Sequence, residues 1–150
     1  MRRSSTEGVT RTVIQTWILF GSLVFLAACS QEGSYSLSIF FPDDLARESI
    51  NQVSIQALET SGRSCKELLE GDVDPSMLLE RSGQIVDYPP ASSQQLTQVP
   101  SGNYLFWVRG LKEDAVLLRG CASGRVQDGA HVEIRVTLDW YCQPGEGGEV

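Results

Sequence analysis

The sequence predicts a mainly β protein: an antiparallel β-sandwich of about seven strands with a short helical insert, preceded by a cleaved signal helix. Short segments in which apolar and polar residues alternate recur from residue 35 to residue 138. Alternation with a period of two is the pattern of a half-buried strand. Turn-forming residues separate these segments, and one apolar segment, residues 65–83, lacks the alternation.

Near the start of the chain, a positively charged segment precedes an apolar run. Residues 13–28 read VIQTWILFGSLVFLAA, and Arg2, Arg3 and Arg11 precede the strongly apolar part against a single acidic residue. A charged start, an apolar core of roughly 7–15 residues and small residues at the end are the features of a secretory signal peptide. A permanent transmembrane helix needs about 20 apolar residues, more than this run provides. We therefore expect residues 1–28 to be removed.

The run ends in Leu26-Ala27-Ala28-Cys29, which resembles the lipobox of bacterial lipoproteins. In that family the cysteine thiol receives a diacylglyceryl group, the peptide is cut before the cysteine, and the new amine is often acylated. The resemblance implies that Cys29 is the first mature residue and the lipid anchor, since two or three acyl chains hold a protein stably on a membrane. The alternative is a soluble secretory peptide with an incidental cysteine. Ser30, in place of an aspartate that resembles an inner-membrane retention mark, favours the outer membrane of the cell envelope.

Removal of this peptide takes away three arginines and one glutamate, which leaves nine basic and 18 acidic side chains and a formal net charge of −9. Such a balance argues against nucleic acid and anionic lipid head groups as partners, because both reward a basic surface. The remaining length fits one domain. We expect a lipidated tether over residues 29–34, a sandwich domain over 35–142 and a flexible acidic tail over 143–150.

The first four expected strands differ in length. Residues 35–41 alternate apolar residues with Ser, Ser and Phe and end at a proline, and residues 52–57 alternate Val, Ile and Ala with Gln, Ser and Gln. Residues 85–88 and 96–99 are shorter candidates. Two prolines close the first of these, and the Pro-Ser-Gly-Asn turn at 100–103 closes the second.

The last three expected strands show a clearer alternation. Residues 104–109 place a Tyr, a Phe and a Val on one face, and the charged residues 112–114 form a hairpin tip into a strand over 116–121. Residues 131–138 have four apolar side chains on one face and polar ones on the other, after an Asp-Gly turn at 128–129. These strands complete the sandwich.

The helical insert is expected between the second and third strands. Residues 65–83 contain apolar side chains without alternation, and residues 66–70 fit one helical turn ended by a glycine. Asp74 is a good N-cap and Pro75 suits the first helical position. We therefore expect a short helix over residues 75–81.

A second resemblance concerns the entry to the fifth strand. Residues 99–108 read VPSGNYLFWV, which resembles the Pro-Gly-x-Tyr strand entry of transthyretin-like and carboxypeptidase-regulatory-like modules. These modules are β-sandwiches in which the turn leads into a central strand. More broadly, the chain resembles small surface lipoproteins of β-sandwich type.

With Cys29 lipidated, three cysteines remain: Cys65, Cys121 and Cys142. An odd number in an oxidising compartment allows one disulfide and one spare thiol, in three possible pairings. The surface lipoproteins that the chain resembles use such a pair to pin the insert to the sheet, which implies Cys65–Cys121 here. Cys142 lies in a segment expected to fray, where a bridge with Cα atoms within about 7 Å is hardest to form. Cys121–Cys142 is the alternative.

We predict no catalytic, cofactor-binding or metal-binding residues. The chain has one histidine, His131, on the polar face of the last strand, and no nucleophile-elbow motif such as GxSxG. Residues 72–83 begin like a calcium loop, but Met77 and Gly83 stand where an EF-hand has glycine and glutamate.

Three large apolar residues lie on strand faces that are not part of the expected core. Leu105 and Trp107 lie on the second face of the fifth strand, and Phe40 lies on the corresponding side of the first. Large apolar groups on the outer face of a sheet are either covered or form an interaction patch. Residues 77–79 of the insert are one possible cover; an exposed platform for a glycan, a peptide or a partner subunit is the other reading.

The sequence thus favours a non-catalytic, lipid-anchored envelope protein, a binding or structural module whose ligand is unknown. The membrane is reached through Cys29, and an envelope protein or a glycan is the expected further partner. A small envelope hydrolase or an enzyme inhibitor is the alternative.

Overall fold

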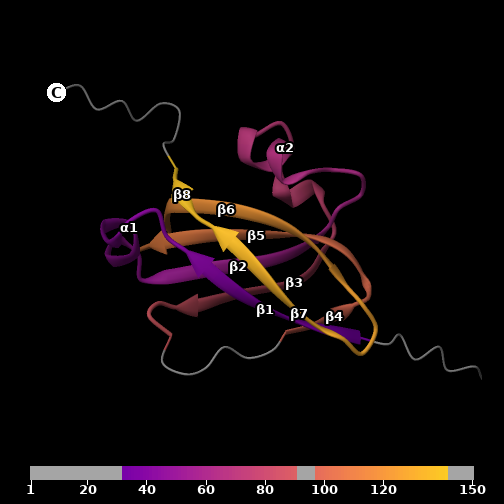
Figure 1. The fold of residues 1–150 in the computed structure, drawn as a ribbon. Coiled ribbons are helices and arrows are strands. Elements are labelled where there is room, and N and C mark those ends of the chain that lie inside the picture. Colours follow the sequence, from indigo (N-terminus) through magenta and orange to yellow (C-terminus); the bar gives the residue numbers. More distant parts are fainter. Residues whose placement is uncertain (1–31, 91–96, 142–150) are drawn as a thin grey trace, which may run out of the picture.

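The computed structural model describes residues 32–90 and 97–141 of the chain. In this part, the strands form a three-stranded sheet in the order β4-β1-β7 and a five-stranded sheet in the order β3-β2-β5-β6-β8. The smaller sheet crosses in front of the larger one in Figure 1, and a shared core lies between them. This arrangement confirms the predicted β-sandwich.

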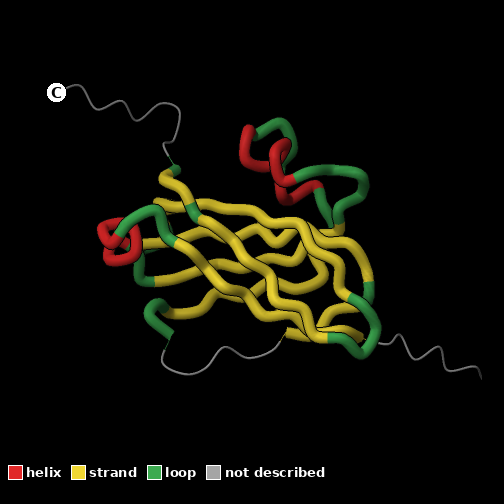
Figure 2. Tube along the Cα trace, in the orientation of Figure 1, coloured by secondary structure: helices red, strands yellow, loops and turns green. Residues whose placement is uncertain are grey.

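Strands make up most of the described chain, and short helical segments interrupt them (Figure 2). In chain order the elements are β1 (Glu32–Phe40), α1 (Asp44–Ser49), β2 (Gln52–Glu59), α2 (Cys65–Glu70), η1 (Pro75–Met77), β3 (Glu80–Asp87), β4 (Thr97–Pro100), β5 (Gly102–Lys112), β6 (Ala115–Val126), β7 (His131–Thr137) and β8 (Asp139–Trp140).

Several predicted features fall outside the described residues. They are the signal peptide over residues 1–28, the lipobox with Cys29, the cysteine Cys142, and the tail over 143–150. Among the described helices, none is long and apolar enough to cross a membrane.

Aromatic side chains fill the space between the sheets. The rings of Tyr35 and Phe106 have centroids 4.7 Å apart, and Tyr104 lies 6.1 Å from Phe106. Tyr104 donates to the Pro100 carbonyl oxygen at 2.6 Å, and the Tyr35 and Ser82 hydroxyls are 2.8 Å apart. Each buried phenol therefore has the polar partner that burial requires. The inward face predicted for the fifth strand is confirmed.

Two glycines allow β7 to pass close across β6. A side-chain carbon at position 120 would collide with the carbonyl oxygen of Thr137, and one at position 124 would collide with Ile134. Gly120 and Gly124 are needed at these points for their small size rather than for an unusual backbone conformation. The two sheets consequently approach each other closely where β7 crosses β6.

β1 occupies the centre of the smaller sheet. It pairs antiparallel with β4 and parallel with β7, whereas every other pairing between described strands is antiparallel. β1 also begins at Glu32, so residues 32–34, which we assigned to a tether over 29–34, belong to the sheet. They lie opposite residues 98–100 of β4, and this pairing shortens the segment ahead of the domain.

The helix predicted over residues 75–81 is wrong. A single 3-10 turn covers Pro75–Met77, and β3 begins at Glu80. The predicted cap is present, because Asp74 Oδ1 accepts a hydrogen bond from the Ser76 N–H at 2.8 Å. β3 pairs with β2 along its whole length. These ladder hydrogen bonds outweigh the weak preference of so short a segment for helix.

Other differences concern the extent of the elements. β3, over Glu80–Asp87, is longer than the strand predicted at 85–88. Two short elements were not predicted. One is α1, in which Asp43 acts as N-cap and accepts from the Ala46 N–H at 2.6 Å. The other is β8, a short strand that pairs with β6.

Candidate binding groove

The insert between β2 and β3 lies against the outer face of the five-stranded sheet, where Figure 1 shows α2 above β5 and β6. Leu68 of α2 and Val73 pack against Leu58, Leu105 and Trp107 of the sheet. Leu105 is 1% exposed and Trp107 is 5% exposed. The covered alternative for these two side chains is therefore confirmed.

The residues that make the cover differ from those we expected. Leu68 and Val73 are the buried members, and Leu78 is partly buried against them. Met77 and Leu79, by contrast, are 81% and 51% exposed. The reason is that η1 ends at Met77 and β3 begins soon after, so that no helix turns the 77–79 side chains together toward the sheet.

The possible interaction patch of Phe40, Leu105 and Trp107, the alternative to a covered face, does not form. Phe40 is 48% exposed on β1, in the three-stranded sheet, whereas the other two side chains are buried on β5 of the five-stranded sheet. A common patch would need both strands in one sheet, and their separation between the two sheets removes the common surface.

A disulfide joins Cys65, at the start of α2, to Cys121 of β6, with Cα atoms 5.4 Å apart. This is the pairing that the resemblance to surface lipoproteins implied, and it excludes the alternative bond from Cys121 to Cys142. Cys121 lies directly opposite Trp107 in the β5–β6 register. The bond thus attaches the insert to the sheet beside the buried indole.

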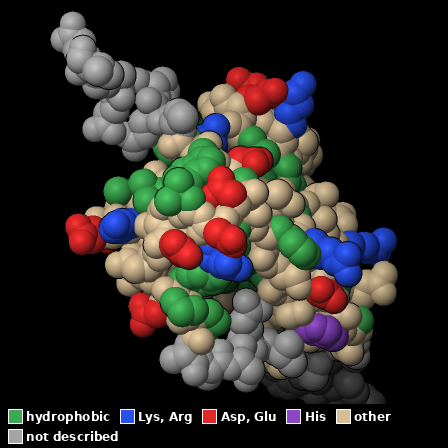
Figure 3. Space-filling model, turned by 60° about the vertical axis from the view of Figure 1, so that its left-hand side comes forward, with side chains coloured by type: hydrophobic (Ala, Val, Ile, Leu, Met, Phe, Trp, Pro, Cys, Tyr) green, Lys and Arg blue, Asp and Glu red, His purple; other side chains and the backbone are tan. Residues whose placement is uncertain are grey.

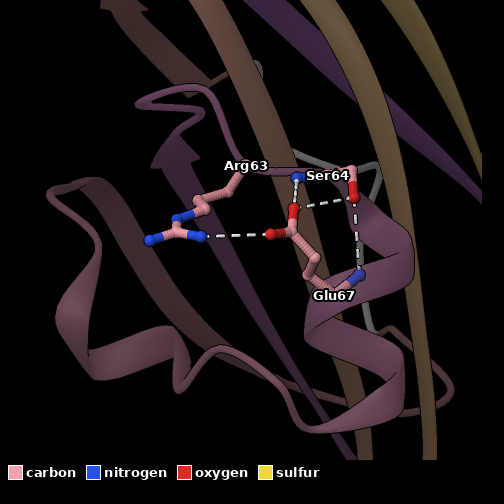
Figure 4. A network of polar contacts seen from close by, with 3 residues as sticks. All are labelled: Arg63, Ser64 and Glu67. Carbon is pink, nitrogen blue, oxygen red and sulfur yellow. Dashed lines mark hydrogen bonds and ion pairs between the residues drawn. The ribbon is translucent and has the colours of Figure 1, made fainter.

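Caps at both ends define α2, and Figure 4 shows the network at its N-terminal end. The Ser64 hydroxyl accepts from the Glu67 N–H at 3.4 Å, and Glu67 Oε2 accepts from the Ser64 N–H at 2.8 Å, which makes a capping box. Arg63 donates to the same carboxylate at 3.1 Å. The hydrogen bonds from Ser64, and then that from Arg63, lower the pKa of Glu67. Gly71 ends the helix at φ 82°, a left-handed conformation that suits glycine.

A groove of about 360 Å³ lies between the insert and the outer face of β5 and β6. Small-molecule pockets commonly run from roughly 300 to 1,000 Å³, so this groove is of the size that holds a small ligand. The residues that line it are Leu68, Gly71, Val73, Asp74, Pro75, Trp107, Arg109, Val116, Arg119 and Tyr141.

Arg109 is the first of two arginines in the groove. Its Nη2 donates to Ser54 Oγ at 3.0 Å and to Gln56 Oε1 at 3.5 Å. Gln56 in turn donates to Glu80 Oε2 at 2.5 Å, which orients its amide oxygen toward the guanidinium. The Nε of Arg109 is buried and has no hydrogen-bond partner among the described residues. An unpaired buried donor of this kind costs free energy until an acceptor reaches it.

Arg119 lies directly opposite Arg109 in the β5–β6 register. Directly paired residues on neighbouring strands have Cβ atoms about 4.5–5.5 Å apart and point to the same face. The Arg119 guanidinium lies 4.4 Å above the centroid of the Tyr141 ring. Stacking on an aromatic face leaves the N–H edge of a guanidinium available to a further acceptor.

No ion pair joins either groove arginine to an acidic side chain in the described parts of the chain. Asp139 of β8 lies opposite Arg119 in register without forming one. Asp74 lines the groove, and hydrogen bonds from Ser76 lower its pKa, so its carboxylate is ionised at neutral pH. The groove therefore holds two cations and one anion, with the cations side by side.

His131 lies away from the groove, on the outer face of the three-stranded sheet. Its ring nitrogens are each 3.1 Å from a hydroxyl, that of Ser34 or that of Ser36. Glu133 accepts from Ser38 at 2.7 Å instead of orienting the imidazole. A catalytic triad needs a carboxylate on the histidine, and this exposed ladder does not supply one. In residues 32–90 and 97–141, no three His, Cys, Asp or Glu side chains are grouped to hold a metal ion.

Comparison with known proteins found no matching family model, no matching curated protein and no matching solved structure. Neither Arg109 nor Arg119 was predicted as a site residue from the sequence. Elsewhere the surface is mixed in character: Figure 3 shows acidic, basic and apolar side chains interspersed over one face of the molecule.

Proposed function

We propose that this protein is a non-catalytic binding module of the cell envelope, held at the membrane by lipid on Cys29, and that its ligand occupies the groove between the insert and the sheet. The observation that supports binding is the pair of arginines, Arg109 and Arg119, placed side by side without an acidic partner among the described residues.

This arrangement is unfavourable for the empty protein. Like charges directly opposite each other on neighbouring strands destabilise a sheet, and a buried polar atom without a partner adds a desolvation cost. Arg109 shows both features. Arg109 donates to Ser54 and Gln56, and Arg119 stacks on Tyr141, but neither set of contacts requires a second cation beside it. A ligand that accepts hydrogen bonds from both guanidinium groups removes the cost and gives the pair a role.

The lining of the groove supports binding over catalysis. Its described residues include a single carboxylate, Asp74, and neither a histidine nor a serine or cysteine. Nucleophilic and general acid–base mechanisms rely on such side chains within hydrogen-bond reach of one another. The chemistry that these residues do offer is recognition.

Native mass spectrometry of the protein, released from its own envelope in a mild detergent, tests the binding role. We expect an adduct of defined mass on the wild-type protein and on Arg125→Gln, a variant of an exposed arginine on the same strand as Arg119. The double variant Arg109→Gln/Arg119→Gln should lose the adduct. Spectra without an adduct, or with the same adduct on all three proteins, would contradict the proposal.

The anchor is tested separately with Cys29→Ser. This variant should lack the mass of the acyl groups and should leave the membrane fraction after a high-salt wash, because a single protein domain without lipid has no comparable membrane affinity. If it still sediments with membranes, lipid on Cys29 is not what holds the protein there.

A further inference from the structure

We infer that the ligand of this groove is a small organic acid, with one compact anionic group, a carboxylate or a phosphate, on an apolar body. This inference rests on the proposed binding function and names the chemical class that the groove would take.

The anionic group is indicated by the way Arg109 is held. Ser54 and Gln56 hold the guanidinium through its Nη2 on the β2 side. Glu80 holds Gln56 from behind, so this whole row of side chains is already in position before a ligand arrives. The Nε–H remains without an acceptor among described residues. Guanidinium groups recognise carboxylates and phosphates through pairs of parallel N–H donors.

Arg119 supplies a second cation at the same place. Tyr141 supports its guanidinium from one face, and the register brings it directly beside Arg109. Two adjacent guanidinium groups can contact both oxygens of one carboxylate or several oxygens of one phosphate. The positive charge is thus concentrated in one spot, which fits one compact anion.

The apolar body is indicated by the other lining residues. Five apolar residues line the groove beside the arginines: Leu68, Val73 and Pro75 of the insert, and Trp107 and Val116 of the sheet. Apolar side chains beside a few converging polar groups are typical of small-molecule sites. The volume of about 360 Å³ limits the ligand to a metabolite-sized molecule.

The acidic surroundings disfavour a polyanion. Asp74 lines the groove and Asp139 lies opposite Arg119, and the whole chain carries a formal net charge of −7. A ligand with charges spread over a long backbone would meet these carboxylates and the general negative field. A single anionic group held between the two arginines avoids them.

Titration with three matched probes tests this inference: phenylacetate, phenyl phosphate and the uncharged phenylacetamide. The readout is the NMR signal of the Trp107 indole N–H in the detergent-solubilised full-length mature protein. We expect at least one of the two anions to shift this signal saturably, with an affinity about tenfold or more above that of the amide, since hydrogen bonds between charged groups contribute that much or more. The tighter anion identifies the carboxylate or the phosphate as the natural group.

The variants Arg109→Gln and Arg119→Gln should each weaken anion binding about tenfold or more, and Arg125→Gln should leave it unchanged. Equal binding of phenylacetate and phenylacetamide would overturn the inference, as would undiminished binding by either groove variant. Absence of any saturable shift with both anions at about 10 mM would also overturn it. In that case an arginine-dependent adduct in native mass spectrometry would still support the groove as a binding site, so the two proposals fail separately.

Discussion

Replacement of Trp107 by serine measures how completely the insert covers the five-stranded sheet. The indole is 5% exposed and packs with Leu68 and Val73 of the insert and with Leu105 of its own strand. Serine removes the ring and leaves a hydroxyl in an apolar environment. The substitution therefore combines the loss of buried apolar area, a cavity and an unpaired polar group.

The magnitude follows from the buried area. A tryptophan or other aromatic side chain buries about 150–250 Å², and at about 25 cal/mol per Å² this contributes about 4–6 kcal/mol as an upper estimate. Replacements of buried aromatic residues by small ones cost about 3–5 kcal/mol. We expect Trp107→Ser to lower the free energy of unfolding by about 4 kcal/mol.

Urea denaturation followed by far-ultraviolet circular dichroism measures this loss without relying on the fluorophore that is removed. Trp140 offers a matched control, because its side chain is 43% exposed on β8. Trp140→Ser should cost about 1 kcal/mol or less. A loss below about 1 kcal/mol for Trp107→Ser, or one equal to that of the control, would refute the reasoning and return Trp107 to the surface.

Ile134 is 5% exposed between the sheets, so Ile134→Ala should lower the unfolding free energy by about 2–4 kcal/mol. Arg135→Ala, on the solvent face of the same strand, should stay within about 0.5 kcal/mol; equal losses in urea titrations would show that β7 is not buried on one face only. Gly120→Ala should cost about 1–3 kcal/mol in the same assay, because the added carbon meets a backbone carbonyl of β7, and an unchanged midpoint would contradict the close approach of the sheets. Joint replacement of Cys65 and Cys121 by alanine removes a cross-link of sequence separation 56. Because the unfolded chain gains entropy, the free energy of unfolding should fall by about 4 kcal/mol. A thermal midpoint equal to that of the wild type would argue against this stabilising role of the disulfide.

The strands were predictable where one face is buried and the other is exposed to solvent. β7 shows this best, since Ile134 and Val136 are buried while Glu133 and Arg135 are exposed, and its predicted bounds agree with the structure to within a residue. The turns were readable as well, because the hairpin tip needs left-handed residues and Asp114 adopts φ 69°. Alternation does not report which sheet a strand joins. For this reason Phe40 was wrongly grouped with two side chains of β5.

The groove was not predictable from alternation because a β-bulge shapes it. Counted back from the pair Lys112–Ala115 at the hairpin tip, Arg109 would face Leu118. A register shift between Gly110 and Leu111 moves the partner by one position, so that Arg119 comes opposite Arg109 instead. A one-residue slip turns every later side chain to the other face of the sheet. The meeting of the two arginines is thus a property of the folded register.

The parallel pairing of β1 with β7 determines how the domain would respond to a mechanical load on its N-terminal end. β1 is hydrogen-bonded on both sides, to β4 and to β7. A pull on the chain ahead of Glu32 acts along the strand axis, and ladder hydrogen bonds run across that axis. When the opposing force acts at the C-terminal end of β7, the parallel pairing makes this pull shear the ladder bonds together rather than open them one after another. With the lipid anchor that we propose at Cys29, this geometry would place such a force along the most resistant direction of the sheet.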